Sequence, residues 1–154
     1  MEKVYLDWAK VDEAVWTLVD EVRKDFIPEI LVGIARGGLI PAVRMSNIMD
    51  DLLMRIVDVK FYENIEKRRE APKITVPLTG DVKGMKVLIV DDVADTGKTL
   101  ETVKKHVLER GALEVKIAVI AKKSRSITEP DYHIFETEKW IVFPWEKIPV
   151  TKKK

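Results

Sequence analysis

The sequence predicts an α/β fold, with a Rossmann-like, mostly parallel sheet flanked by helices and a small cap, or hood, made by the C-terminal segment. Short runs rich in apolar residues, of strand length, occur at 30–34, 54–61, 85–90 and 115–121, and helical periods separate several of them. A strand, a helix and another strand in this order pair in parallel through a right-handed crossover, which leaves both sheet faces covered. With 154 residues, of which 46% are hydrophobic, the chain is predicted to form a single domain, 1–154.

The first predicted element is an amphipathic helix that begins after Asp7, a residue type that caps helix N-termini well. Its apolar residues recur at the spacing of one helix face: Val11, Ala14, Val15, Leu18, Val19 and Val22. The strand at 30–34 then runs into an Arg-Gly-Gly turn at 36–38, and a second helix is predicted from near Pro41. Gly111 is placed to end a third helix over 98–110.

Two segments do not follow the alternation of strands and helices. Between Glu63 and Gly80 no period persists, charges cluster, and prolines stand at 72 and 77, so we predict a long flexible loop, or a loop with a weak hairpin. A loop of this length is often a lid over an active site. The segment 129–149 has three prolines and two tryptophans and is predicted to be the cap over the sheet edge.

Composition excludes several classes of function. Lysine and arginine (27) nearly balance aspartate and glutamate (26), so a nucleic-acid partner is not expected. There is no cysteine, which rules out disulfides and thiolate chemistry, and no apolar run approaches the length of a membrane span, so we expect a soluble, cytoplasmic protein. Glutamine is absent and asparagine occurs only at Asn47 and Asn64, a bias typical of thermophiles.

The most informative stretch is Val-Leu-Ile-Val-Asp-Asp-Val-Ala-Asp-Thr-Gly-Lys-Thr at 87–99, a buried strand followed by two acids, a small turn and a helix start. Ligands of open α/β sheets bind just beyond such strand ends. Backbone amides at a helix start can surround a phosphate, with the hydroxyls of Thr96 and Thr99 as further donors. A nucleotide P-loop does not fit, because that motif needs glycine at position 92, which is aspartate.

Two carboxylates beside a phosphate would repel it unless they face hydrogen-bond donors or a metal. Ribose hydroxyls and hydrated Mg²⁺ meet that need. The stretch resembles the binding motif for 5-phosphoribosyl diphosphate (PRPP) in type I phosphoribosyltransferases, and the fold expected from the resemblance is theirs. The resemblance implies that Asp91 and Asp92 hold the ribose hydroxyls and, through these and water, Mg²⁺. It also implies that the 5-phosphate is held by Ala94, Asp95, Thr96, Gly97, Lys98 and Thr99.

Asp95 is implied by the same resemblance to be the general acid or base that handles the purine N7 proton. Its alternative is a helix N-cap, and the two roles are compatible. Arg36, Gly37 and Gly38 resemble the family's diphosphate loop, with Arg36 stabilising the leaving group, although a plain turn is the alternative. That loop often contains a cis non-proline peptide in the family.

The base site is implied by a resemblance to xanthine-guanine phosphoribosyltransferases. Lys122 matches the lysine that bonds the purine O6, Trp140 the residue that stacks on the base, and Ile141 a source of backbone contacts. A solvated lysine and a buried core tryptophan are the alternatives. Glu146 stands where that subfamily has aspartate, so its role is open.

The resemblance therefore implies a magnesium-dependent pentosyltransferase of purine salvage. It would transfer ribose 5-phosphate from PRPP to guanine, xanthine or hypoxanthine, with a homodimer as the expected assembly and no membrane or nucleic-acid partner. The alternatives are an enzyme of the same fold for adenine or a pyrimidine, and a PRPP-sensing regulator without catalysis.

Overall fold

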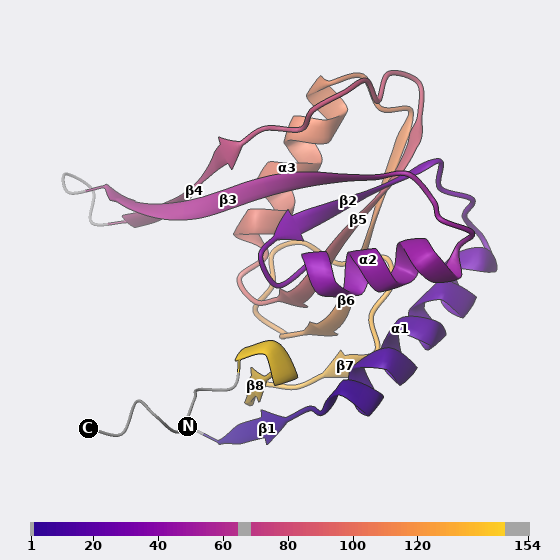
Figure 1. The fold of residues 1–154 in the computed structure, drawn as a ribbon. Helices are drawn as coiled ribbons and strands as arrows, with labels where there is room; N and C mark the ends of the chain where they lie inside the picture. Colours follow the sequence, from indigo (N-terminus) through magenta and orange to yellow (C-terminus); the bar gives the residue numbers. More distant parts are fainter. Residues whose placement is uncertain (1, 65–68, 147–154) are drawn as a thin grey trace.

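The computed structural model of the protein describes residues 2–64 and 69–146 (Figure 1). The helices are α1 (Trp8–Arg23), α2 (Leu39–Ile48), α3 (Lys98–Glu109) and the short 3-10 helix η1 (Pro144–Glu146). The strands are β1 (Lys3–Tyr5), β2 (Ile30–Ala35), β3 (Met54–Asn64), β4 (Arg69–Val76), β5 (Lys86–Ala94), β6 (Glu114–Lys122), β7 (Phe135–Glu136) and β8 (Trp140–Val142).

A six-stranded sheet in the order β4-β3-β2-β5-β6-β7 forms the centre of the protein. All neighbouring strands are parallel except β3 and β4, so the predicted α/β class is confirmed. Within the described ranges, no helix combines the length and apolar character needed to cross a bilayer.

The two faces of the sheet carry separate apolar cores, because alternate residues of a strand point to opposite faces. Leu31, Leu88 and Ile120 pack in the core that contains the buried face of α1 and residues of α2. Their neighbours Val32, Ile89 and Val119 pack in the core that contains α3. Helices thus cover both faces, and the strand ends between them are left to build a site.

The helices agree closely with the sequence prediction. Asp7 caps α1, and its Oδ1 accepts a hydrogen bond from the Lys10 amide at 2.8 Å. Helix α2 begins at Leu39, two residues before the expected start near Pro41. Proline is tolerated in a first helical turn, where its missing N–H removes no intrahelical bond, so it does not mark the first residue.

The segment 63–80 is not the long loop that the sequence favoured. Strand β3 continues to Asn64, and β4 pairs antiparallel with it (Figure 1). Of the two predicted alternatives, the structure therefore agrees with the hairpin. Pro72 argued against a strand in the sequence, because proline lacks the backbone N–H donor. In the structure Pro72 is paired with Phe61 on an edge strand, where a missing donor is acceptable. Residues 65–68 lie outside the described residues, and the predicted mobility of this segment stays a prediction.

The C-terminal cap is built from both ends of the chain. Strand β8 pairs in parallel with β1, a strand that the sequence did not reveal, while β7 joins the edge of the main sheet beside β6. Trp145 of η1 stacks on Phe143 with ring centroids 4.6 Å apart and also contacts Trp8 at the start of α1. The cap is thereby fixed to the first helix, over the edge of the sheet.

Candidate active site

Adjacent parallel strands deliver their carboxyl ends to one edge, and here β2, β5 and β6 do so side by side. The Arg-Gly-Gly turn follows β2, and the acid pair lies in the last part of β5, directly before the turn at 94–99. Lys122 ends β6, and Lys123 follows it. The structure therefore brings together the segments that the sequence singled out.

Asp91 and Asp92 form the most unusual electrostatic feature of this edge. Burial, and then the neighbouring charge of Asp92, raise the pKa of Asp91 well above its ordinary value. Burial also raises the pKa of Asp92. Asp91 Oδ1 accepts the Asp92 amide and Asp92 Oδ1 accepts the Val93 amide, each at 2.8 Å. Two carboxyls held in this way are suited to a ligand that brings positive charge or hydroxyl donors.

Asp91→Asn is expected to stabilise the ligand-free protein at pH 7, raising its melting temperature by a few degrees. Because the folded state raises this pKa, it binds more protons than the unfolded chain, so the free energy of unfolding of wild type falls as pH rises from the ordinary to the raised value. Below that window both states are protonated, and the variant loses its advantage. Thermal unfolding between pH 3.5 and 8 measures this, with the exposed Asp20→Asn as control. An advantage that shrinks as pH rises would contradict the expectation.

The turn at 94–99 lines a cavity of about 420 Å³ together with Asp91, Phe61 and Arg125. Gly97 has a φ of +82°, and a Cβ there would lie 2.6 Å from the Thr128 amide nitrogen, so glycine is required. Thr96 and Thr99 line the cavity at the start of α3. Lys98 is exposed and does not line it. Amides and hydroxyls at a helix start are a suitable lining for a phosphate.

The Arg-Gly-Gly turn packs directly on the acid pair. The peptide between Ala35 and Arg36 is cis, as the resemblance implied. A Cβ at Gly37 would lie 2.0 Å from Asp92 Oδ2, and one at Gly38 would lie within 2.7 Å of the Ile34 and Val90 carbonyl oxygens. Only a chain without side chains at 37 and 38 can approach the acids this closely, while Arg36 itself is exposed.

Gly38→Ala is expected to lower the melting temperature more than Gly84→Ala does, because its Cβ would collide with backbone on two strands. Gly84→Ala is the control, since a Cβ at Gly84 meets nothing within 4 Å; its φ of +72° is unfavourable for alanine, whereas the φ of Gly38 is −69°, so collision and backbone strain are separated. Thermal unfolding of both variants and of wild type measures the effect. Equal behaviour of the two variants would show that the close approach at Gly38 is unimportant.

A second cavity of about 230 Å³ adjoins the first and reaches the cap. Lys123 lies in it with its side chain 7% exposed, its Nζ 5.3 Å from the centroid of the Trp140 ring and 3.9 Å from Asp95 Oδ1. A lysine this deeply buried is unusual outside a functional site or an ion pair. The full lining is Asp92, Val93, Asp95, Lys123, Trp140, Ile141, Phe143 and Glu146.

Lys122, the predicted partner of the purine O6, does not line this cavity. Its Nζ bonds Glu129 Oε1 at 2.5 Å. Adjacent residues of an extended chain point to opposite sides, so only one of two consecutive lysines can face the pocket, and it is Lys123. The presence of Ala-Lys-Lys did not by itself decide between them.

Glu146, whose role the sequence left open, lines the same cavity. Burial, and then the charge of Asp92, raise the pKa of its carboxyl. It is therefore an acidic group held close to the buried lysine and the Trp140 ring, at a position where it can meet a ligand.

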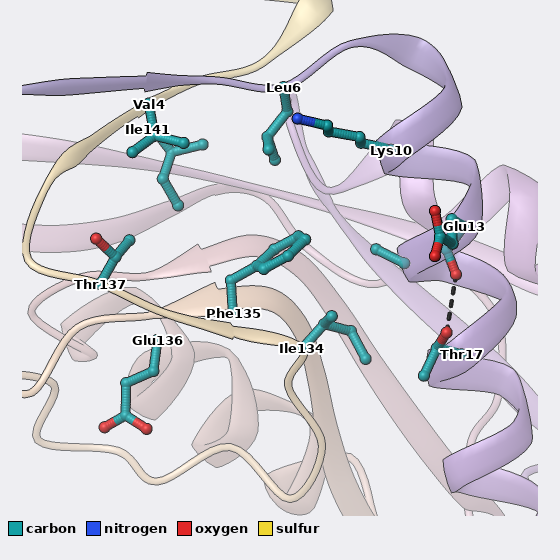
Figure 2. Close-up of a pocket in the computed structure, with 11 residues that line it drawn as sticks. Val4, Leu6, Lys10, Glu13, Thr17, Ile134, Phe135, Glu136, Thr137 and Ile141 are labelled. Carbon is teal, nitrogen blue, oxygen red and sulfur yellow. Dashed lines mark hydrogen bonds between the residues drawn. The ribbon is translucent and has the colours of Figure 1, made fainter.

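A larger cavity of about 550 Å³ lies on the other side of the cap, between α1 and the strands β1, β7 and β8 (Figure 2). Apolar side chains such as Leu6 and Phe135 line it, with Lys10 at one side. Ile141 lines both this cavity and the pocket of Lys123. At β8 the cap is therefore a thin layer between the two cavities.

A mostly parallel sheet carries, at one edge, the acid pair, the turn at 94–99 (the phosphate-type turn) and the Arg-Gly-Gly turn at 36–38 (the diphosphate-type turn). This is the arrangement expected of a phosphoribosyltransferase. Residues 4–148 match the family model described as a phosphoribosyl transferase domain, and the chain belongs to the phosphoribosyltransferase family.

Within the family, the chain is similar to purine enzymes. It is 33% identical over 132 residues to the xanthine-guanine phosphoribosyltransferase of Desulfotalea psychrophila, which covers 85% of this chain and 76% of that one. It is 31% identical over 141 residues to the hypoxanthine-guanine phosphoribosyltransferase of Streptococcus pneumoniae R6, covering 88% and 78%. The solved purine phosphoribosyltransferase of Pyrococcus horikoshii superposes with a TM-score of 0.88 at 52% identity, covering 99% of this chain and 100% of that one.

Proposed function

We propose that the protein transfers ribose 5-phosphate from PRPP to a 6-oxopurine. The products are a purine nucleoside monophosphate and inorganic diphosphate. The observation that carries the proposal is the pocket of Lys123, Trp140 and Glu146, which shares Asp95 with the cavity of the phosphate-type turn. A base in the pocket of Lys123 and a sugar phosphate in the cavity of the 94–99 turn would meet at Asp95. The similarity to xanthine-guanine and hypoxanthine-guanine enzymes supports the same substrate class.

PRPP is assigned to the edge of β2 and β5. Asp91 and Asp92 accept hydrogen bonds from the ribose hydroxyls, and the amides of 94–99 hold the 5-phosphate. Arg36, Gly37 and Gly38 hold the diphosphate, with the guanidinium as a charged donor.

Mg²⁺ fits the acid pair. Burial raises the pKa of both carboxyls, no cation of the described residues is a cause of either shift, and Mg²⁺ prefers oxygen ligands. Among the described residues no group of three acidic or histidine side chains is arranged to hold a metal, so the remaining ligands would come from PRPP and water. Bound there, Mg²⁺ would supply positive charge to the leaving diphosphate.

The reaction breaks the bond between ribose C1 and the diphosphate oxygen and forms a bond from C1 to a purine nitrogen. Arg36 and the amides of its turn stabilise the negative charge of the leaving group. Asp95 takes the proton that the purine loses at N7. The segment 63–79 is the proposed lid, which would close over the site and exclude water from the electrophilic sugar.

Lys123 is assigned the recognition of the purine O6, in place of Lys122. Its ammonium has three donors and no acceptor, so it pairs with a 6-oxo group and is opposed by a 6-amino group. Trp140 stacks on the base and the backbone at Ile141 meets its edge. Steady-state assays with PRPP, Mg²⁺ and each of guanine, xanthine, hypoxanthine, adenine, uracil and orotate test the assignment. Turnover confined to 6-oxopurines supports it; turnover with adenine or a pyrimidine supports the other transferases, and PRPP binding without turnover supports a regulator.

Glu146 is assigned to the purine 2-position, where the 2-amino group of guanine can donate to its carboxylate. Glu146→Gln is expected to lower kcat/KM for guanine by about tenfold or more, the value of one charge-assisted hydrogen bond, and to change hypoxanthine much less. Hypoxanthine, which lacks the 2-amino group, is the internal control. An equal loss with both bases would show that Glu146 does not read this position.

A cytoplasmic homodimer from a thermophile is the setting that we propose for this activity. PRPP is an intracellular metabolite, and the absence of glutamine and the two asparagines suit high temperature. Light scattering and thermal unfolding test the assembly and the stability, with a dimer and a melting temperature above about 80 °C expected.

A further inference from the structure

Arg125 follows β6 closely and makes the strongest polar contact of the proposed catalytic Asp95. The Arg125 Nε donates to Asp95 Oδ1 at 2.6 Å, and Arg125 Nη2 contacts the same oxygen. One of the two carboxylate oxygens of Asp95, Oδ1, is therefore already occupied by a guanidinium. The Arg125 side chain is 59% exposed, so it can leave this position without unpacking the core.

Arg125 also lines the cavity of the 94–99 turn, and its positive charge differs from the charges of the other lining residues. Among the described residues that line this cavity, Arg125 is the one cation, while Asp91 and Asp95 are acidic. A phosphate ester entering here is attracted by Arg125 and repelled by both acids. A guanidinium forms strong bidentate bonds with phosphate, so the ligand competes directly with Asp95 for Arg125.

The chain around Arg125 is fixed to the phosphate-type turn. The Ile127 amide donates to the Thr96 carbonyl at 2.8 Å, and the Thr128 hydroxyl donates to the Gly97 carbonyl at 2.9 Å. The missing Cβ of Gly97 lets the two segments approach. The backbone around Arg125 is thus held beside the turn, and only the arginine side chain needs to move to reach a bound phosphate.

We infer that Arg125 is a phosphate-responsive latch: it holds Asp95 in the free protein and moves to the 5-phosphate of PRPP, which releases Asp95 to act on the base. The inference rests on the proposed function, since it places the 5-phosphate in the cavity of the 94–99 turn. Arg125 thus has two roles: it positions Asp95 in the free protein and binds the 5-phosphate in the complex. The latch would keep Asp95 from acting until the sugar phosphate is present.

The test uses ribose 5-phosphate, which carries the 5-phosphate alone, and inorganic diphosphate, which reports the other site. Arg125→Gln is expected to weaken ribose 5-phosphate binding by about tenfold or more and to leave diphosphate binding unchanged. Arg125→Lys, which keeps the charge, should recover part of the loss. Arg23→Gln is the control, because Arg23 donates to the Ile48 carbonyl on α2 and does not line the cavity.

Crystal structures of the wild-type protein with and without ribose 5-phosphate complete the test. The guanidinium should contact Asp95 without the ligand and the phosphate with it. A guanidinium that stays on Asp95 beside a bound phosphate, or an Arg125→Gln variant that binds ribose 5-phosphate as wild type does, would overturn the latch. Failure of the proposed function is separate, since it would appear as absence of nucleotide formation by the wild-type protein.

Discussion

Replacing Lys123 with methionine is expected to lower kcat/KM for guanine and hypoxanthine by about 10³ to 10⁴ while leaving PRPP affinity nearly unchanged. Methionine keeps an apolar stem against Trp140 and removes the donor, so the purine O6 loses its partner inside a closed pocket. Sites built to bond a polar group discriminate by this order when the bond cannot form. Steady-state kinetics with each base, and calorimetry with PRPP, measure the two quantities.

Lys122→Met is the matched control for this experiment. Lys122 and Lys123 are adjacent, but the ammonium of Lys122 bonds Glu129 and lies outside the pocket lining. Its loss removes an ion pair with an exposed glutamate, which contributes little. Guanine kinetics of Lys122→Met should remain within about threefold of wild type. The reverse result, with Lys122→Met inactive and Lys123→Met active, would restore the assignment drawn from the sequence.

Changing both acids, Asp91→Asn with Asp92→Ala, is expected to weaken PRPP binding in the presence of Mg²⁺ by about 100-fold or more. The change removes the two carboxylates that accept the ribose hydroxyls and attract the metal, and each charged hydrogen bond contributes about 1.5 to 3 kcal/mol. Calorimetry with PRPP, with Mg²⁺ and with EDTA, measures the loss.

The variant should also become insensitive to Mg²⁺, whereas wild type should bind PRPP much more weakly in EDTA. Asp20→Asn combined with Asp131→Ala has the same change of charge; Asp20 is exposed, and Asp131 accepts the Ile117 amide away from the strand ends that form the site. A double variant at 91 and 92 that binds PRPP as tightly as this control would remove the acid pair from the site.

The parallel strands β2, β3, β5 and β6 and the helices α1, α2 and α3 were predictable because each rests on a local pattern. The buried face of α1 is written in its helical period, and Asp7 marks its start. The phosphate-type turn was predictable for a similar reason, since strand, acids, small turn and helix start are consecutive. These parts of the site depend on residues that are close together in the sequence.

The rest of the site depends on contacts between distant segments. Strand β1 has only three residues, and its partner β8 lies near the other end of the chain, so no local period marks it. The choice between Lys122 and Lys123 depends on which way each side chain leaves the end of β6. Arg125 had no pattern at all, because its meaning comes from its contact with Asp95.

The most direct test of the central claim is a competition assay in which limiting PRPP and Mg²⁺ are offered equal concentrations of guanine and adenine. The nucleotide products are then separated by chromatography and identified by mass. A protein in which Lys123 meets the purine O6 should form guanosine monophosphate and release inorganic diphosphate. The amount of adenosine monophosphate should be lower than that of guanosine monophosphate by a factor of at least about 10³. Comparable amounts of the two nucleotides, or no nucleotide from either base, would contradict the account.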